Sequence, residues 1–173
     1  MMTRRSFLKI TTLVMMSSYG GKVFGLVKKE KVLKLHNIHT GERLNVKYSS
    51  SGSYDRNALN EINNLMRCHY TNEVKPIDIK VIDLLCDIKD SIGTDKELLI
   101  ISGYRSHAYN KYLRQIGRGV ACNSLHLQGR AIDFRIPGVD NQMLTTVAKA
   151  FHTGGVGTYP DFVHIDDGRV RSW

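Results

Sequence analysis

The sequence predicts a single α+β domain in which helices flank a small, mainly antiparallel sheet. Three observations lead to this prediction. Strand and helix patterns follow one another without the regular βαβ repeat of a parallel sheet. With 173 residues, of which 42% are hydrophobic and 24% charged, the chain has the length and composition of one soluble domain. It also lacks a long Pro/Gly/Ser-rich linker and an internal repeat that would divide it.

The first elements form a predicted β-hairpin followed by two helices. Residues 32–38 and 44–48 alternate apolar and polar side chains on either side of a turn at 40–42. Asp55 or Ser53 caps the first helix, whose inner face carries Leu59, Ile62, Leu65 and Met66. The second helix has Pro76 in its first turn and ends at Gly93. Its apolar residues recur at helical spacing: Ile77, Val81, Leu84, Leu85 and Ile88.

The second half begins with a short buried strand, residues 97–101, which runs into the turn Ser102-Gly103-Tyr104-Arg105-Ser106. A helix over 107–116, a Gly-rich loop and a strand over 130–136 follow. Asp140 starts the next helix, with Met143, Leu144, Val147, Ala148 and Phe151 on its inner face. Residues 154–159 and 162–166 complete the fold as two short strands or a tight hairpin.

Residues 1–25 have the composition of an export signal. Arg4 and Arg5 precede an uncharged segment, residues 10–21, that is too short to span a membrane and is followed by small residues. The arginine pair before Phe-Leu-Lys resembles the twin-arginine signal, by which bacteria export folded proteins. Cleavage after Gly20 or after Gly25 is consistent with this pattern. We therefore expect a periplasmic protein, with the twin-arginine translocase as a partner during export and a folded domain over residues 26–173.

The basic charge does not identify a nucleic-acid-binding protein. Of the formal net charge of +9, four charges fall within the signal segment: Arg4, Arg5, Lys9 and Lys22. The remaining 21 bases against 16 acids are spread along the chain, which is typical of a solvated basic surface. Because an exported protein rarely meets nucleic acid, we expect no such partner. The anionic cell wall is compatible with this charge.

The three cysteines do not have the paired spacing of a zinc site. Cys86 falls in the apolar pattern of a helix, so we expect it in the core. An oxidising compartment permits disulfide bonds, and the sequence leaves open whether Cys68 and Cys122 form one.

The most informative motif is a histidine and an aspartate in one short segment. His126 and Asp133 are separated by Gly129, which lets the backbone bend between them, and His164 follows on a later strand. Two imidazoles and a carboxylate can hold one zinc ion on three sides and leave a fourth position for water. Alternate positions on adjacent strands share a face, so these residues can converge. The other histidines lack such a context, and we expect them on the surface: His36, His39, His69, His107 and His152.

The motif Ser-x-His-x-x-Gly-x-Ala-x-Asp at residues 124–133, with a later histidine, resembles the zinc D-Ala-D-Ala peptidases. That superfamily shares the fold of the lysostaphin-type enzymes and the hedgehog N-terminal domain. The resemblance is closest to the exported murein endopeptidase K branch and extends over about residues 31–173. Its further features are Ser102 to Ser106, Asn110, Gly154 to Gly157, Phe162 to Asp166 and Arg171-Ser172-Trp173.

The resemblance implies roles for specific residues. His126, Asp133 and His164 would bind one zinc ion, whose water is the nucleophile. Arg105 would contact the substrate, and Ser124 would hydrogen-bond its backbone or shape the loop. A carboxylate would act as general base. Asp161 is our first choice, with Asp166 orienting a zinc ligand, and the reverse assignment stays open.

The function implied is a periplasmic zinc peptidase that hydrolyses peptide cross-links in peptidoglycan, acting on the stem peptides. Cross-links between two diaminopimelate residues are among the candidate bonds. A D,D-carboxypeptidase that trims free stem peptides is one alternative. A non-catalytic, zinc-containing wall-binding protein is the other.

Overall fold

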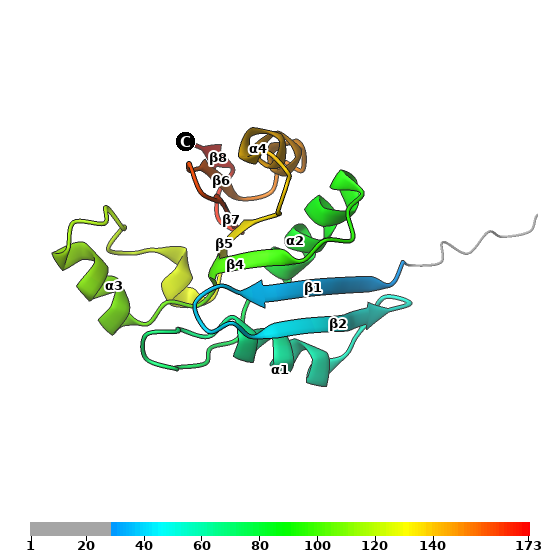
Figure 1. Cartoon of the computed structure of the whole chain (residues 1–173), viewed down its shortest axis with the longest axis horizontal. Helices are drawn as coiled ribbons and strands as arrows, with labels where there is room; N and C mark the ends of the chain where they lie inside the picture. The colour runs from blue at the N-terminus through cyan, green and yellow to red at the C-terminus, as the bar shows by residue number, and fades with distance from the viewer. Residues whose placement is uncertain (1–28) are drawn as a thin grey trace, which may run out of the picture.

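The computed structural model describes residues 29–173, which form one curled sheet of eight strands with helices on both faces (Figure 1). The strand order is β3-β2-β1-β4-β5-β7-β6-β8. Five of the strand pairs are antiparallel. Two are parallel, β1 with β4 and β6 with β8. The predicted α+β class is therefore confirmed, but the sheet is mixed and larger than expected. The parallel β1–β4 pair arises because two intervening helices carry the chain back to the same end of the sheet.

The strands follow the predicted order, with two additions. Their bounds are β1 Lys31–Asn37, β2 Arg43–Ser50, β3 Ser53–Tyr54, β4 Leu98–Ser102, β5 Ala131–Arg135, β6 Gly155–Thr158, β7 Val163–Asp166 and β8 Arg171–Ser172. Strands β1 and β2 form the predicted hairpin. Strands β6 and β7 also pair antiparallel, so of the two predicted arrangements for residues 154–166 the hairpin is confirmed. The two-residue strands β3 and β8 were not predicted, because segments this short carry no alternation pattern.

The helices begin at side-chain caps. Helix α1 spans Arg56–Leu65, and the Asp55 carboxylate accepts hydrogen bonds from two backbone amides of its first turn. Ser53, the alternative cap, lies in β3 instead. Helix α2 spans Ile79–Ile92 and ends, as predicted, at Gly93 with φ 70°. Pro76 does not belong to its first turn, because the Asp78 side chain caps the amide of Lys80 and starts the helix later.

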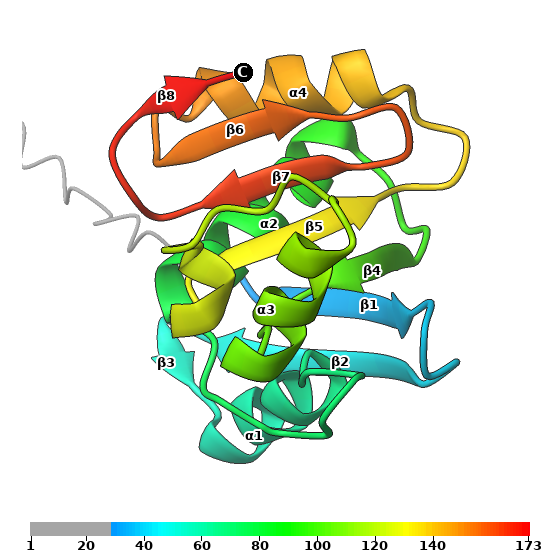
Figure 2. The same ribbon diagram turned by 90° about the vertical axis from the view of Figure 1, so that its left-hand side faces the viewer.

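The last two helices lie on opposite faces of the sheet. Helix α3, His107–Gln115, is capped by Ser106, and helix α4, Asn141–Ala150, is capped by Asp140. Figure 2 shows α3 in front of the sheet together with the short 3₁₀ turn η1, Leu125–Gln128, whereas α2 and α4 lie behind it. On α4, Leu144 and Ala148 are buried as predicted, but Met143 is 52% exposed, so its predicted place on the inner face is wrong.

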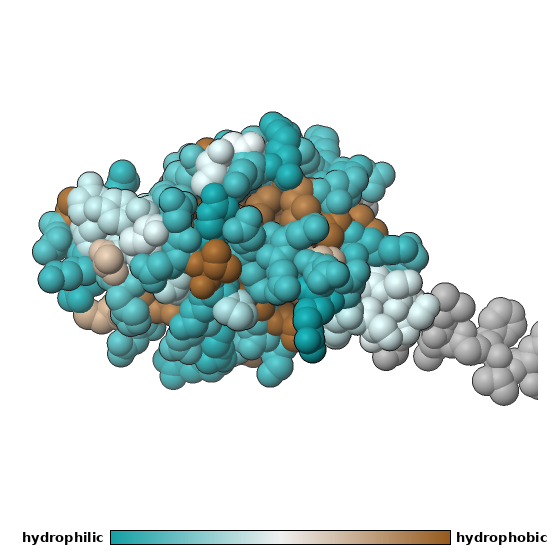
Figure 3. All heavy atoms as spheres, turned by 90° about the horizontal axis from the view of Figure 1, so that it is seen from below, coloured by the Kyte–Doolittle hydropathy of each residue, from teal (hydrophilic) through white to brown (hydrophobic). Residues whose placement is uncertain are grey.

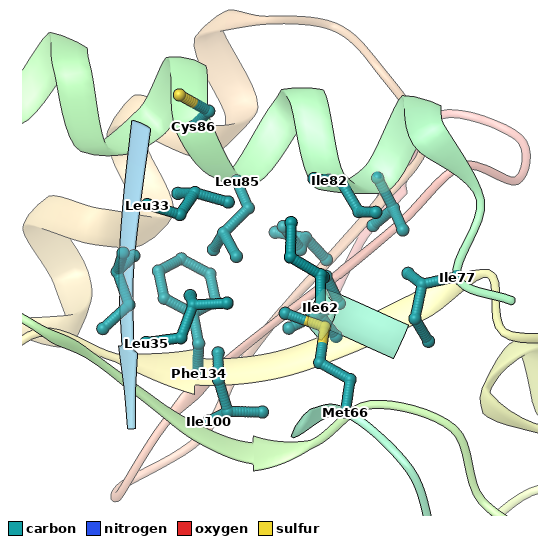
Figure 4. Packing of buried hydrophobic residues seen from close by; sticks show 14 of the residues in the cluster. Leu33, Leu35, Ile62, Met66, Ile77, Ile82, Leu85, Cys86, Ile100 and Phe134 are labelled. Carbon is teal, nitrogen blue, oxygen red and sulfur yellow. The ribbon is translucent and has the colours of Figure 1, made fainter. Parts of the chain in front are cut away.

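The hydrophobic core fills the space between the sheet and α1, α2 and α4 (Figure 4). Leu33, Leu35 and Phe134 from the sheet and Ile82 and Leu85 from α2 are buried almost completely. Each such side chain contributes about 1.5–3 kcal/mol through burial. This core gives strands β4, β5 and β7 a rigid support. The underside of the molecule, by contrast, is largely hydrophilic, with hydrophobic residues in separate groups (Figure 3).

Several predictions concern positions away from the sheet. The proposed export signal, residues 1–25, lies outside the described residues. Within residues 29–173, no helix has the length and apolar character of a membrane span. Cys86 is buried, as expected. Cys68 and Cys122 do not form a bridge, because Cys68 is buried with its sulfur 3.4 Å from the Ser106 hydroxyl and Cys122 lies on an exposed loop.

Candidate metal centre

Three neighbouring elements bring together the two histidines and the aspartate of the sequence motif. His126 lies on η1, Asp133 on β5 and His164 on β7. Asp133 and His164 are directly opposite in the antiparallel β5–β7 pair, so their side chains share a face. The Nδ1 atom of His164 is 2.8 Å from Oδ1 of Asp133, and Nε2 of His126 is 3.2 Å from the same oxygen.

Gly129 provides the bend that the sequence predicted between His126 and Asp133. Its φ of +70° is in the left-handed region, and it ends η1. A Cβ atom there would lie 2.2 Å from the carbonyl oxygen of Pro76. The Gly129 carbonyl accepts a hydrogen bond of 2.8 Å from the Asp78 amide at the start of α2. This close approach fixes η1, and with it His126, against the body of the protein.

Hydrogen bonds at the outer ring nitrogens determine which nitrogen of each histidine faces the centre. The Gly103 carbonyl can only accept, so Nδ1 of His126 donates to it at 2.7 Å. In the same way, Nε2 of His164 donates to Oδ2 of Asp166 at 3.1 Å. The inner nitrogens, Nε2 of His126 and Nδ1 of His164, then carry no proton in the neutral rings. They lie 3.3 Å apart.

This arrangement fits a metal ion. Ligand atoms of all three residues lie within 4.8 Å of one another. Ligands at 2.0–2.2 Å in a tetrahedral site would be about 3.3–3.6 Å apart, close to the distances between the inner atoms. With both rings neutral, the three acceptor atoms repel one another unless a proton or a metal ion lies between them. The donor set of two imidazole nitrogens and one carboxylate oxygen is a common one for zinc.

The electrostatics of the cluster also favour a cation. Burial raises the pKa of Asp133, but His126 and His164 more than compensate and hold that pKa well below its usual range. Burial is the main cause of the lowered pKa of His126. Burial also opposes the charged form of His164, but its bonds to Asp133 and Asp166 outweigh this and raise the pKa to about 8. A metal ion that binds here would displace that proton.

The two other predicted acids occupy different surroundings. His164 and Asp166 lie on the same side of β7, Phe162 immediately precedes the strand, and all three line the same cleft. Asp166 is completely buried and lies at the outer nitrogen of His164. Asp161 is exposed in the β6–β7 connection and lines a separate hollow with Arg135 and Asn141.

The cluster lies in a cleft of about 380 Å³ whose walls differ in character. One wall contains Arg105, Ser124 and Arg118, the first two being predicted substrate contacts. The guanidinium of Arg105 is 3.5 Å from Oδ2 of Asp133. Among the described residues, its Nε is buried without a hydrogen-bond partner. This arginine therefore has hydrogen-bonding capacity left for a ligand in the cleft.

Another part of the lining, the aromatic wall of Tyr159, Phe162 and Trp173, was not among the predicted substrate contacts. Tyr159 stacks on Phe162 at 4.5 Å between ring centroids, and the Trp173 indole donates a 2.9 Å hydrogen bond to the Tyr159 hydroxyl. Trp173 also lies 5.3 Å from the His164 ring. Arg171 was missed as well: its guanidinium bonds both oxygens of Asp166. Apart from the recurrence of Arg171-Ser172-Trp173 in the family motif, the sequence holds no signal for these contacts.

Comparisons with known proteins identify the family of the chain. The family model described as "Peptidoglycan L,D-endopeptidase MepK" matches residues 26–173. The chain is 39% identical over 148 residues to the probable peptidoglycan L,D-endopeptidase MepK of Haemophilus influenzae, covering 84% of this chain and 80% of that protein. It is 38% identical over 147 residues to peptidoglycan L,D-endopeptidase MepK of Escherichia coli K12, covering 84% and 81%.

Proposed function

The chain belongs to the peptidoglycan L,D-endopeptidase MepK family of peptidases. We therefore propose that it is a periplasmic zinc metallopeptidase that hydrolyses peptide cross-links in peptidoglycan. The observation that carries the proposal is the convergence of three metal-binding atoms at an open cleft. The names of the relatives support the endopeptidase reaction, and the cleft supports a site open to a peptide.

The proposed cofactor is one zinc ion held by His126, Asp133 and His164. Bound there, zinc would supply Lewis-acid activation of the scissile carbonyl and of water. The protein would contribute a fixed tautomer of each histidine. Gly103 and Asp166 act at the outer nitrogens, so the inner nitrogens stay available to the metal.

Arg105 and the aromatic wall are the proposed substrate contacts, with Ser124 at the rim of the cleft. A cross-link between two diaminopimelate residues carries a carboxylate next to the scissile amide nitrogen. The unpaired donor of Arg105 suits such a carboxylate, because a guanidinium binds it with charge-assisted hydrogen bonds. The aliphatic part of the stem peptide would pack on Trp173 and Phe162. A D-Ala terminus has a carboxylate at the same place, so this contact is shared by a carboxypeptidase.

We assign different roles to the two acids near His164. Asp166 already accepts hydrogen bonds from Gly155, Gly168 and Arg171, so it has little capacity to accept a proton and acts by orienting His164. Asp161 is exposed, lies three residues before His164 and is next in sequence to the cleft residue Phe162. We propose Asp161 as the general base, which requires the β6–β7 connection to turn it toward the cleft when substrate binds.

The proposed location is the periplasm. Its support is the sequence of residues 1–25 together with the peptidoglycan substrate named for the relatives. Residues 26–173 would be the exported peptidase domain.

The central experiment is digestion of purified sacculi by the mature chain, with His126→Ala as the matched variant. We expect dimeric muropeptides to be converted to monomers, and we expect a chelator or His126→Ala to abolish this conversion. Zinc should restore activity to the chelated wild type but not to the variant. Liquid chromatography with mass spectrometry identifies the bond that is cut.

Other outcomes would point to the alternatives. Shortened monomer stems without loss of dimers would indicate a D,D-carboxypeptidase. Binding to sacculi with no cleavage under any condition, and with zinc bound, would indicate a non-catalytic wall-binding protein.

A further inference from the structure

A second feature of the molecule is a series of stacked aromatic rings on and beside α3. His39 stacks on His69 at 3.9 Å, and His69 meets Tyr109 edge-on at 4.8 Å. Tyr70 stacks on Tyr109 at 5.0 Å and on Tyr112 at 5.4 Å. We call these five residues the aromatic ridge. Three separate segments of the chain contribute to it: the β1–β2 turn, the loop after α1, and α3.

Part of the ridge has a structural role. Asn110 is the only residue of α3 that is buried, so this helix has few core contacts. The partly buried rings of Tyr109 and His69 meet edge-on and help to attach the helix to the body of the protein. Burial lowers the pKa of His69 to about 4, with His39 and Arg105 contributing, so its ring is neutral at physiological pH.

The attachment of α3 does not explain the outer rings of the ridge, those of Tyr70 and Tyr112. Tyr70 is 54% exposed and Tyr112 is 42% exposed, although each belongs to a stack with fixed geometry. Exposed aromatic rings that are held in place are typical of binding surfaces, because they lose little conformational entropy when a ligand binds.

The ridge residues do not line the cleft themselves, but Arg105 and Arg118, which precede and follow α3, do. The helix begins at His107, two residues after Arg105, whose backbone amide donates a hydrogen bond of 3.1 Å to the His126 carbonyl. Tyr112 is six residues along the helix from Ser106, a distance of about 9 Å. An extended peptide of three or four residues spans about 10–14 Å. A stem peptide of this length that ran from the cleft along α3 would place its attached sugar beside Tyr112.

We propose that the aromatic ridge binds the glycan strand of peptidoglycan through the outer rings of Tyr70 and Tyr112. This inference rests on the proposed function, because it assigns a second contact to the same polymer. The apolar C–H face of a pyranose ring packs on an aromatic face, and the tyrosine hydroxyls remain free to bond sugar hydroxyls. The ridge would orient the strand, while the cleft would carry the peptide chemistry.

The test separates glycan binding from peptide hydrolysis. The full mature chain is compared with Tyr70→Ala/Tyr112→Ala, and with Tyr54→Ala as the control, since Tyr54 is 49% exposed but lies on β3. Binding is measured on glycan strands from which an amidase has removed the peptides. Hydrolysis is measured on intact sacculi and on soluble cross-linked peptides that carry no sugar.

We expect the double variant to bind glycan strands about tenfold more weakly and to digest sacculi correspondingly more slowly. Its hydrolysis of sugar-free peptides should match that of the wild type. Tyr70→Phe/Tyr112→Phe, which keeps both rings, should retain most of the binding. Tyr54→Ala should behave like the wild type throughout.

Several results would overturn the inference. The first is a wild-type chain that cleaves sugar-free peptides but does not bind peptide-free glycan. The second is equal glycan binding by the wild type and the alanine variant. A third is a concentration-dependent dimer that the alanine variant abolishes, with no glycan binding, since the ridge would then be a contact between two copies. If the wild type cleaves no peptide at all, the proposed function fails instead, and glycan binding by the wild type remains a separate measurement.

Discussion

The Asp166 carboxylate accepts several hydrogen bonds that keep it ionised. It accepts hydrogen bonds from the amides of Gly155 and Gly168 and from the guanidinium of Arg171. Burial alone would raise its pKa, but His164, Arg171 and the two amides hold that pKa well below its usual range. A carboxylate that remains ionised beside the outer nitrogen of His164 keeps the proton on that nitrogen. We therefore expect Asp166 to act on the proposed metal centre through His164.

This distinction between Asp166 and Asp161 can be tested with a pair of asparagine variants. We expect Asp166→Asn to weaken zinc binding by about 10- to 100-fold. The one remaining oxygen would accept from Gly155 and Gly168, so a neutral NH₂ group that cannot accept would face His164. We expect Asp161→Asn to leave zinc affinity unchanged and to reduce the rate of peptide hydrolysis by about 10²- to 10⁴-fold. Zinc affinity is measured by competition with a chromophoric chelator, and hydrolysis is measured at saturating zinc.

Each variant is the control for the other. Full activity of Asp161→Asn at saturating zinc would exclude Asp161 as the general base. Unchanged zinc affinity of Asp166→Asn would show that His164 keeps its orientation without this carboxylate.

At the scale of elements, the sequence identified most helices and strands because their signals are local. Asp55, Asp140 and Gly93 are at the helix ends that their side chains or conformational freedom predict. The start of α2 was placed too early because Pro76 suits a first turn equally well, and the Asp78 cap decides between them. The 3₁₀ turn that carries His126 has four residues, too few for a helical pattern, and it is stabilised by contact with the start of α2.

That contact leads to a prediction for Gly129. Gly129→Ala should destabilise the protein by about 2–4 kcal/mol and impair zinc binding, because the new methyl group would collide with the Pro76 carbonyl at a positive φ. Gly93→Ala is the matched control, since Gly93 has the same φ of +70° but nothing within 4 Å. That variant should lose only about 1 kcal/mol and bind zinc normally. Urea denaturation and chelator competition measure the two effects.

Comparing Gly129→Ala with Gly93→Ala separates the cost of the contact with Pro76 from the cost of the positive φ, which both positions share. If the two alanine variants lose equal stability, then φ alone accounts for the cost, and the packing of η1 against α2 contributes nothing. Normal zinc binding by a destabilised Gly129→Ala would show that the position of His126 does not depend on this packing.

At the scale of the whole molecule, the sheet order was beyond prediction, because its pairings join distant segments. Strand β1 pairs with β4 across two helices, and β8 returns to pair with β6. The site was predicted in part. His126, Gly129 and Asp133 form a recognisable local motif, whereas Arg171 and Trp173 reach the cleft through the β6–β8 pairing. The placement of Tyr70 beside Tyr109 likewise depends on tertiary structure alone.

The same dependence on tertiary structure bears on export. His126, Asp133 and His164 meet only when β5 and β7 pair and η1 packs beside them, so the proposed metal binding would be coupled to folding. An export route for folded proteins would let the zinc site form before the chain crosses the membrane, which is consistent with the proposed twin-arginine signal.

The export proposal yields the last prediction. Arg4→Lys/Arg5→Lys preserves the charge of residues 1–25 but removes the arginine pair. If the twin-arginine translocase carries the chain, this variant should stay in the cytoplasm at full length, and periplasmic endopeptidase activity should fall by at least tenfold. Cell fractionation with immunoblotting measures the distribution, and Lys9→Arg, which leaves Arg4 and Arg5 intact, is the control. Undiminished export of the lysine variant would show that charge alone suffices. The signal would then belong to the general secretory class, and the zinc site would have to assemble after the unfolded chain had crossed.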